Sequence, residues 1–190
     1  MTVLFETERL ALRAFTPDDA GRLQELNADR DVMWYLTGGE PTPAEEVTGR
    51  VVPFYLGFYE RHGNSGLGYW AAETRDAREF LGWFHLKPDE HGGVDLGYRL
   101  RKEAWNKGYA TEGARALVDW SFTRLGATRV TGRTMTVNQA SRRVLQKSGL
   151  ALIRTYHDDE NPAIPGAELG TVEYALTREE WTAAGGSRRP

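Results

Sequence analysis

The chain contains no cysteine. This absence excludes disulfide bonds, thiol catalysis and zinc sites built on cysteine, and a cytoplasmic protein is the default expectation. No stretch approaches the roughly 18 consecutive apolar residues of a membrane span, and residues 1–9 show no basic-then-apolar signal pattern. The net charge of −3 provides no broad basic field. We therefore expect neither nucleic acid nor a membrane as a partner.

The composition is that of a folded protein. Hydrophobic residues make up 40% of the 190 residues and aromatic residues 11%, which is enough to form a core. No internal repeat, linker or low-complexity segment interrupts the chain. We expect one domain over residues 1–183 and a disordered tail over residues 184–190.

The hydrophobic patterning predicts a mixed α/β architecture. Alternating or apolar runs predict strands over residues 4–15, 67–73, 80–86, 93–100, 129–135, 150–156 and 171–176. Capping residues and helical spacing predict helices over residues 16–27, 42–61, 110–125 and 138–149, and residues 34–39 read as an aromatic-rich loop. Pro53 should kink or interrupt the second helix, because it removes a backbone donor.

The stretch from Trp105 to Gly113 is the most informative about function. It joins a predicted strand to a predicted helix, and Gly108 and Ala110 add little or no side chain. The first turn of a helix has N–H groups without internal partners and a positive dipole end, so a phosphate can bind there. The alternative is a tight strand-to-helix turn that binds nothing.

Several motifs together resemble the GNAT N-acetyltransferase superfamily. Gly108-Tyr109-Ala110 resembles the glycine-containing acyl-CoA loop of that family. Residues 7–13, 95–98, 138–141 and 144–150 resemble its RimJ/RimL-type branch, and the likeness covers about residues 4–176. It implies a GNAT fold, with a central, mixed, mostly antiparallel twisted sheet of about seven strands flanked by about four helices.

The resemblance implies that acetyl-CoA is the cosubstrate, without a metal, and that a primary amine is the acceptor. The residues that match the family's cofactor-binding positions are Tyr98, Leu100, Asn106, Lys107, Gly108, Tyr109, Ala110, Thr111, Asn138, Ser141 and Arg142. Arg143 is a further candidate for the CoA phosphates. The basic residues are equally typical of a solvated helix face, and Asn138 is also a plain N-cap.

Two positions depart from the family pattern. Trp105 stands where the loop motif has Arg or Gln, and Leu145 stands where many relatives have a tyrosine that protonates the departing thiolate. The resemblance makes Ser141 the substitute donor, although Ser141 can also serve only the helix cap. Asp95 is the candidate base, acting directly or through water, because a carboxylate in an apolar pocket accepts a proton readily. A solvent-facing Asp95 and a base role for His85 are the alternatives.

The acceptor side is expected to be lined by aromatic residues. The candidates are Trp34, Tyr35, Phe54, Phe58, Trp83 and His85, each of which can also be an ordinary core residue. The acceptor is a protein N-terminus, a small amine or an antibiotic amino group, and a homodimer is compatible with the sequence.

Two competing functions remain at this point. One is a non-catalytic acyl-CoA-binding or sensing module, and the other is an unrelated phosphate-binding α/β domain. Residues 157–160, His-Asp-Asp-Glu, look like a metal cluster, but consecutive strand residues point to opposite faces, so we expect no metal there.

Overall fold

The N-terminal residues form a hairpin in the computed structural model of the chain. Strand β1 (Val3–Glu6) pairs antiparallel with β2 (Leu10–Ala14). Thr7 closes the turn, because its N–H donates to the carbonyl of Leu10 at 2.8 Å and its hydroxyl accepts from the Leu10 N–H at 2.9 Å. The single strand predicted over residues 4–15 is therefore wrong, and this turn accounts for the additional strand.

The sheet contains eight strands, one more than expected. After the hairpin come β3 (Gly68–Thr74), β4 (Phe80–Pro88), β5 (Val94–Leu100), β6 (Arg129–Met135), β7 (Ala151–Tyr156) and β8 (Thr171–Thr177). Their hydrogen-bonded order is β1-β2-β3-β4-β5-β6-β8-β7. The β5–β6 pair is parallel, whereas the β1–β2, β2–β3, β6–β8 and β7–β8 pairs are antiparallel. The mixed, mostly antiparallel sheet is confirmed.

The structure describes residues 3–63, 65–89, 91–157 and 164–186. Its helices are α1 (Ala20–Ala28), α2 (Arg30–Thr37), α3 (Ala44–Glu46), α4 (Val52–His62), α5 (Tyr109–Thr123), α6 (Gln139–Lys147) and α7 (Arg178–Ala183). A π-helical turn, Val47–Val51, joins α3 to α4 immediately before Pro53. Because proline has no N–H to donate, this turn is the interruption that Pro53 was expected to cause.

Two helical segments differ from the sequence expectation. The predicted loop over residues 34–39 belongs largely to α2, which Asp29 caps by accepting from the N–H groups of Asp31 and Val32. Gly38, with a φ of 72°, ends that helix. Helix α7 was not predicted, although Thr177 and Glu180 form a capping box at its start.

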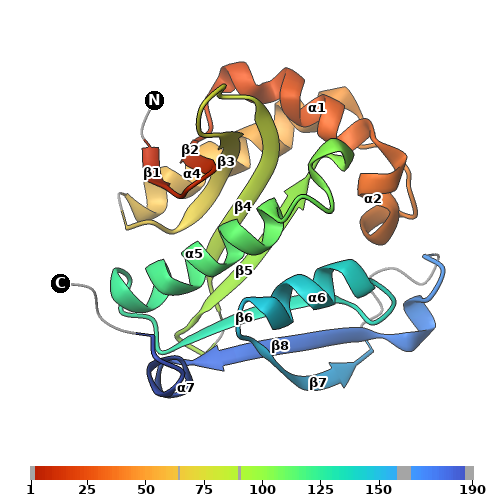
Figure 1. Cartoon of the computed structure of the whole chain (residues 1–190). Coiled ribbons are helices and arrows are strands. Elements are labelled where there is room, and N and C mark those ends of the chain that lie inside the picture. The colour runs from red at the N-terminus through yellow and green to blue at the C-terminus, as the bar shows by residue number, and fades with distance from the viewer. Residues whose placement is uncertain (1–2, 64, 90, 158–163, 187–190) are drawn as a thin grey trace. The chain divides into compact units, whose positions relative to one another are not determined.

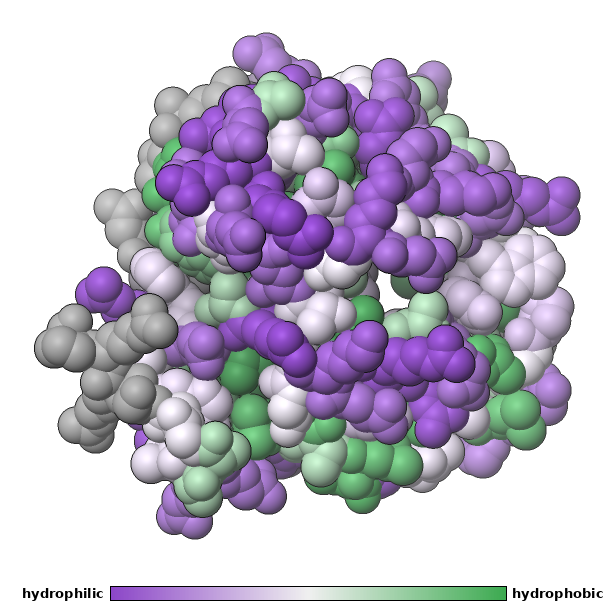
Figure 2. Space-filling view, in the orientation of Figure 1, coloured by the Kyte–Doolittle hydropathy of each residue, from purple (hydrophilic) through white to green (hydrophobic). Residues whose placement is uncertain are grey.

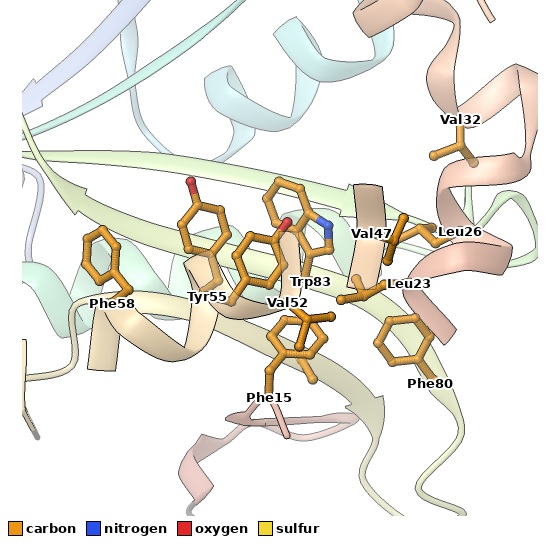
Figure 3. Packing of buried hydrophobic residues seen from close by; sticks show 12 residues of the cluster. Phe15, Leu23, Leu26, Val32, Val47, Val52, Tyr55, Phe58, Phe80 and Trp83 are labelled. Carbon is orange, nitrogen blue, oxygen red and sulfur yellow. The ribbon is translucent and has the colours of Figure 1, made fainter. Parts of the chain in front are cut away.

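The chain forms two compact units. The first comprises Met1–His85 and Tyr98–Ala110, and the second comprises Leu86–Gly97 and Thr111–Pro190. In the first unit, α4 packs against β3, and the buried cluster drawn in Figure 3 combines residues of α1, α4, β3 and β4. Phe15, Leu23, Tyr55, Phe80 and Trp83 are among its members.

The second unit has its own core. Figure 1 shows β6, β8 and β7 as neighbouring strands with α6 against them. Phe122 of α5 contacts Trp181 of α7, with 5.1 Å between the ring centroids. In the predicted tail, Ala184 and Gly185 continue the hydrogen-bonded end of α7 and the Gly186 N–H bonds to the Trp181 carbonyl, whereas residues 187–190 lie outside the described residues.

A buried ion cluster joins three elements of the first unit. The Nη1 and Nη2 atoms of Arg13 each lie 2.8 Å from an oxygen of Asp19, and Nη2 lies 2.7 Å from Oε1 of Glu73. The three residues are between 1% and 5% exposed. Burial alone would raise the pKa of Asp19, but hydrogen bonds from Arg13 and Thr16 outweigh burial and hold that pKa below its ordinary value.

We predict that Arg13→Ala lowers the free energy of unfolding by about 3–5 kcal/mol at pH 7, because it leaves two buried carboxylates without their partner. The pKa of Asp19 is lower in the folded state than in the unfolded state, so this contribution is full above about pH 4 and disappears as pH falls through the folded-state pKa. Urea unfolding across pH should therefore show the two proteins converging in acid.

Arg22→Ala is the matched control. Its side chain is 44% exposed and contacts the same carboxylates, so removing it should cost at most about 1 kcal/mol. A loss below 1 kcal/mol for Arg13→Ala at pH 7 would contradict the role of this cluster.

Candidate functional site

The turn between β5 and α5 has an unusual backbone. After Leu100 a 3-10 turn, Lys102–Ala104, leads to Trp105, whose indole Nε1 donates to the Leu100 carbonyl at 2.9 Å. Asn106 has a φ of 58° and Gly108 a φ of 86°, and α5 begins at the next residue. This left-handed backbone is easy for glycine and strained for most side chains. The turn therefore places α5's first N–H groups next to a residue with no side chain.

Arg9, from the β1–β2 turn, supports this loop and was missed by sequence reasoning. Its Nη1 donates to the Lys107 carbonyl at 2.9 Å, and its guanidinium lies 4.8 Å from the centroid of the Tyr109 ring. A Cβ added at Gly108 would lie 3.2 Å from Arg9 Nη2. No local signal could have identified Arg9, because 98 positions separate it from Lys107.

The beginning of β5 pairs with β6. Its parallel register with β6 contains two pairs, Val94–Val130 and Asp95–Thr131. Leu96 and Gly97, the next residues of β5 in the same unit, are absent from that described register. Further along, Leu100 is buried and Tyr98 is partly buried, with its ring 5.8 Å from that of Phe84.

Helix α6 begins as the sequence predicted. Asn138 is the N-cap, and its side-chain oxygen accepts from the Ser141 N–H at 3.1 Å. The bond uses the backbone of Ser141 and not its hydroxyl, and the Ser141 side chain is partly buried. The cap role of Asn138 is thus confirmed, while the roles of Asn138 and Ser141 toward a ligand stay predictions.

The two arginines of α6 differ in their hydrogen bonding and exposure. Arg142 donates through Nε to the Tyr174 hydroxyl at 3.1 Å and through Nη1 to the Thr136 carbonyl at 3.0 Å. These bonds hold Arg142 within its own unit and engage two of its five donors. Arg143 is exposed, and hydrophilic side chains gather over α6 on the face in view in Figure 2.

Leu145 is a packing residue. It is 1% exposed, and a Cβ added at Gly132 of β6 would lie 2.6 Å from Leu145 Cδ2. Gly132 therefore leaves the space that the Leu145 side chain fills. No polar atom is available at this position, so Leu145 cannot donate a proton.

Asp95 is buried and has charged neighbours. It is 8% exposed, so it is not the solvent-facing residue of the alternative interpretation. Lys87 Nζ lies 3.3 Å from its Oδ2, and Arg133 Nε lies 3.7 Å from its Oδ1. Burial lowers the pKa of Arg133, but attraction to Asp95 and a hydrogen bond with Tyr156 outweigh burial and raise that pKa. Asp95 is therefore an ion-paired carboxylate.

Three of the aromatic candidates join one ring network in the first unit. Trp83 and His85 stack at 5.7 Å between centroids, and both contact Tyr69, at 5.5 Å and 5.0 Å. Phe58 contacts Tyr69 at 5.9 Å. Tyr69 is the centre of this network and also stacks on Tyr55 at 4.1 Å, yet neither tyrosine was a sequence candidate.

The remaining aromatic candidates are more exposed. Phe54 is 46% exposed while its ring contacts Tyr69 at 5.6 Å. Tyr35 is 36% exposed, and Trp34 beside it on α2 is partly buried. Among the described residues, neither Trp34 nor Tyr35 shows a ring contact with the network. The structure thus brings four of the six candidates together.

The described part of the chain holds no group of three or more metal-ligating side chains placed to bind an ion. Residues 158–160 of the acidic loop lie outside the described residues, and His157 Nε2 lies 3.0 Å from the Glu168 carbonyl. Over the same described ranges, no helix has both the length and the apolar character needed to cross a membrane.

Residues 9–151 match the acetyltransferase (GNAT) domain, which is more than half of the chain. The chain belongs to the GNAT acetyltransferase family. An Aspergillus fumigatus protein, FsC-acetyl coenzyme A-N(2)-transacetylase, is 38% identical over 184 residues, covering 92% of this chain and 76% of that protein. This GNAT protein is accordingly an acetyl-CoA-dependent N-acetyltransferase.

Solved structures show the same fold. RimL, a ribosomal L7/L12 alpha-N-protein acetyltransferase in complex with coenzyme A, superimposes with a TM-score of 0.77 at 18% identity, over 94% of this chain and 99% of that one. Spermidine N-acetyltransferase from Vibrio cholerae, in complex with CoA and spermine, superimposes with a TM-score of 0.73 at 17% identity. The match covers 93% of this chain and 99% of that one. At these identities the likeness shows the fold alone.

We predict that Gly108→Val abolishes acetyl-CoA binding, because a branched side chain would fill the space beside the first N–H groups of α5. The wild-type protein should gain about 2.7 kcal/mol of unfolding free energy at a hundredfold excess of acetyl-CoA over its Kd. The variant should gain none, as measured by thermal unfolding and calorimetry.

Gly126→Val controls for backbone strain. Gly126 has a φ of 69°, and a Cβ added there would meet open space. The Gly126→Val variant should therefore lose about 1–2 kcal/mol of stability, as the Gly108→Val variant should. It should nevertheless bind acetyl-CoA normally. Wild-type affinity in Gly108→Val would refute the loop assignment.

Proposed function

We propose that this N-acetyltransferase transfers the acetyl group directly to a primary amine, with both substrates bound at once. The observation that carries the proposal is the left-handed turn at Asn106 and Gly108, braced by Arg9 at the start of α5. Backbone N–H groups at a helix start beside a glycine and a cation suit a pyrophosphate.

The residues around the turn supply the cofactor contacts in this proposal. The N–H groups from Lys107 to Thr111 bind the pyrophosphate. Arg9 adds a positive charge beside them, which Trp105, at the position where the family motif has Arg or Gln, cannot provide. The backbone of Tyr98 and Leu100 pairs with the pantetheine arm. This arrangement is supported by the early end of the β5–β6 register at Asp95.

The chemistry requires a neutral amine and a proton for the leaving sulfur. The amine nitrogen attacks the thioester carbon, a C–N bond forms, and the C–S bond breaks. We assign the proton on sulfur to the Ser141 hydroxyl, because Leu145 is buried and apolar. Asp95, which lies beside Lys87 and Arg133, accepts the amine proton through water. His85 is the alternative base.

A small-molecule amine is the acceptor we favour. The relative at 38% identity carries N(2)-transacetylase in its name, and it covers most of this chain. A protein N-terminus is the second candidate, because the RimJ/RimL-like motifs agree with a fold shared with RimL, which acetylates a ribosomal protein. Antibiotic amino groups belong to the same small-molecule class.

An amine panel tests the proposal. Acetyl-CoA turnover against polyamines, amino acids, aminoglycosides and N-terminal peptides should release free CoA thiol only when a suitable amine is present. The absence of cysteine from the chain keeps the thiol readout clean. Tight CoA binding without amine-dependent thiol release would instead indicate a sensing module.

We predict that Ser141→Ala lowers kcat about 100-fold while the Kd for acetyl-CoA changes less than about twofold, because only the proton donor is removed. The α6 cap should survive, since it uses the Ser141 backbone N–H. Asn138→Ala, which removes the cap acceptor, is the comparison and should lower stability by about 1 kcal/mol. Equal losses of kcat and affinity in Ser141→Ala would refute the donor role.

A further inference from the structure

Arg99 is a partly buried cation that the proposed chemistry does not use. It lies on β5 between Tyr98 and Leu100, and its side chain projects to the opposite face from theirs. Its guanidinium lies 5.2 Å from the centroid of the Trp83 ring, and Nη1 donates to the side-chain oxygen of Asn27. Its Nε is buried and has no hydrogen-bond acceptor among the described residues.

Trp83 presents a second unused donor in the same place. The residue is 7% exposed, and its indole Nε1 is buried without an acceptor among the described residues. Figure 3 shows Trp83 next to Tyr55 within the buried cluster, with 6.2 Å between the ring centroids. Buried donors are nearly always satisfied in native proteins, so two of them on adjacent side chains suggest a missing acceptor.

A negatively charged group suits this place best. Within the described residues of the first unit, Arg99 has contacts with the amide of Asn27 and the ring of Trp83, but with no carboxylate. Burial raises the pKa of Tyr55, and this effect outweighs the positive charge of Arg99, which lowers it. The pKa of Tyr55 therefore lies well above its ordinary value, and Tyr55 is neutral at pH 7. By contrast, the buried Arg13 of the same unit has two carboxylate partners. A buried charge is normally paired.

We infer that Arg99 and Trp83 bind a carboxylate carried by the acceptor amine, so that the acceptor is an amino acid or an amino-acid derivative. The inference rests on the proposed transfer to an amine and names the substrate class for it. Arg99 donates to the carboxylate through its fork, and the Trp83 indole adds a neutral donor. The rings of Tyr69 and His85, which meet edge-on, give the surrounding wall.

Matched amine pairs test this inference in the full-length protein. Lysine and cadaverine differ by one carboxylate, and alanyl-alanine differs from its C-terminal amide by one charge. The wild type should use the carboxylated member of each pair with kcat/KM higher by about 10- to 100-fold, the range for charge-assisted hydrogen bonds. Arg99→Met should abolish that preference and leave turnover of the uncharged member nearly unchanged.

Trp83→Phe and Arg101→Met complete the set. Trp83→Phe keeps the ring and removes the indole donor, so it should weaken the preference less than Arg99→Met does. Arg101 is exposed and paired with Glu25 and Glu103, so Arg101→Met should keep the full preference. The Kd for acetyl-CoA should be the same in all of these proteins.

Stability separates a ligand role from a structural one. Removing a partly buried cation that lacks a counter-ion should leave the midpoint of thermal unfolding unchanged or higher in Arg99→Met. Lysine should raise that midpoint in the wild type in the presence of CoA, and cadaverine should raise it less.

Three results would overturn the inference. The first is that the wild type shows no preference for the carboxylated member of any pair, and the second is that the preference survives in Arg99→Met. The third is a loss of acetyl-CoA affinity in Arg99→Met, which would show that the anion bound by Arg99 belongs to the cofactor. Failure of the proposed function looks different. In that case no amine would release thiol, while lysine would still bind more tightly than cadaverine in calorimetry with CoA present.

Discussion

The left-handed turn at Asn106 and Gly108 is the constraint around which the functional part of the chain is arranged. Strand β5 ends at Leu100 and α5 begins at Tyr109, and the connection takes a positive φ at Asn106 and at Gly108 just before the helix. The turn is not held by local bonds alone, because Arg9 arrives from the N-terminal hairpin to bind the Lys107 carbonyl and cover the Tyr109 ring. The hairpin that the sequence pattern does not reveal thus positions the loop, since its turn carries Arg9.

Buried charges follow one rule in this protein, with one exception. Arg13 is enclosed by Asp19 and Glu73 in the first unit, and Glu173 by Arg129 and Arg154 in the second. Each cluster ties neighbouring parts of its unit together, and each gives its buried charge at least two partners of opposite sign. Arg99 has no such partner among the described residues of its unit. A cation kept without a counter-ion costs stability, and this makes it a better candidate for binding than the paired charges.

Much of the fold was predictable because its signals are local. The strand over residues 129–135 and the Asn138 cap of α6 are confirmed at the expected positions. The errors also have local causes. The first predicted strand runs through Thr7, whose turn bonds are not visible in an alternating pattern. The aromatic residues Trp34 and Tyr35 led to a predicted loop, although Asp29 and Gly38 mark the ends of a helix there. The Thr177 capping box was a readable signal that went unused.

The site was predictable only in part. The sequence by itself determined the cofactor loop, the helix start at Asn138 and the family, because each depends on residues close together in the chain whose spacing sets backbone geometry. Only the tertiary structure decided that Asp95 is ion-paired, that Arg9 braces the loop, that Tyr69 joins the aromatic rings and that Arg99 lacks a counter-ion. Those facts depend on contacts between residues far apart in sequence, and burial and electrostatic pairing arise only when the folded chain brings them together.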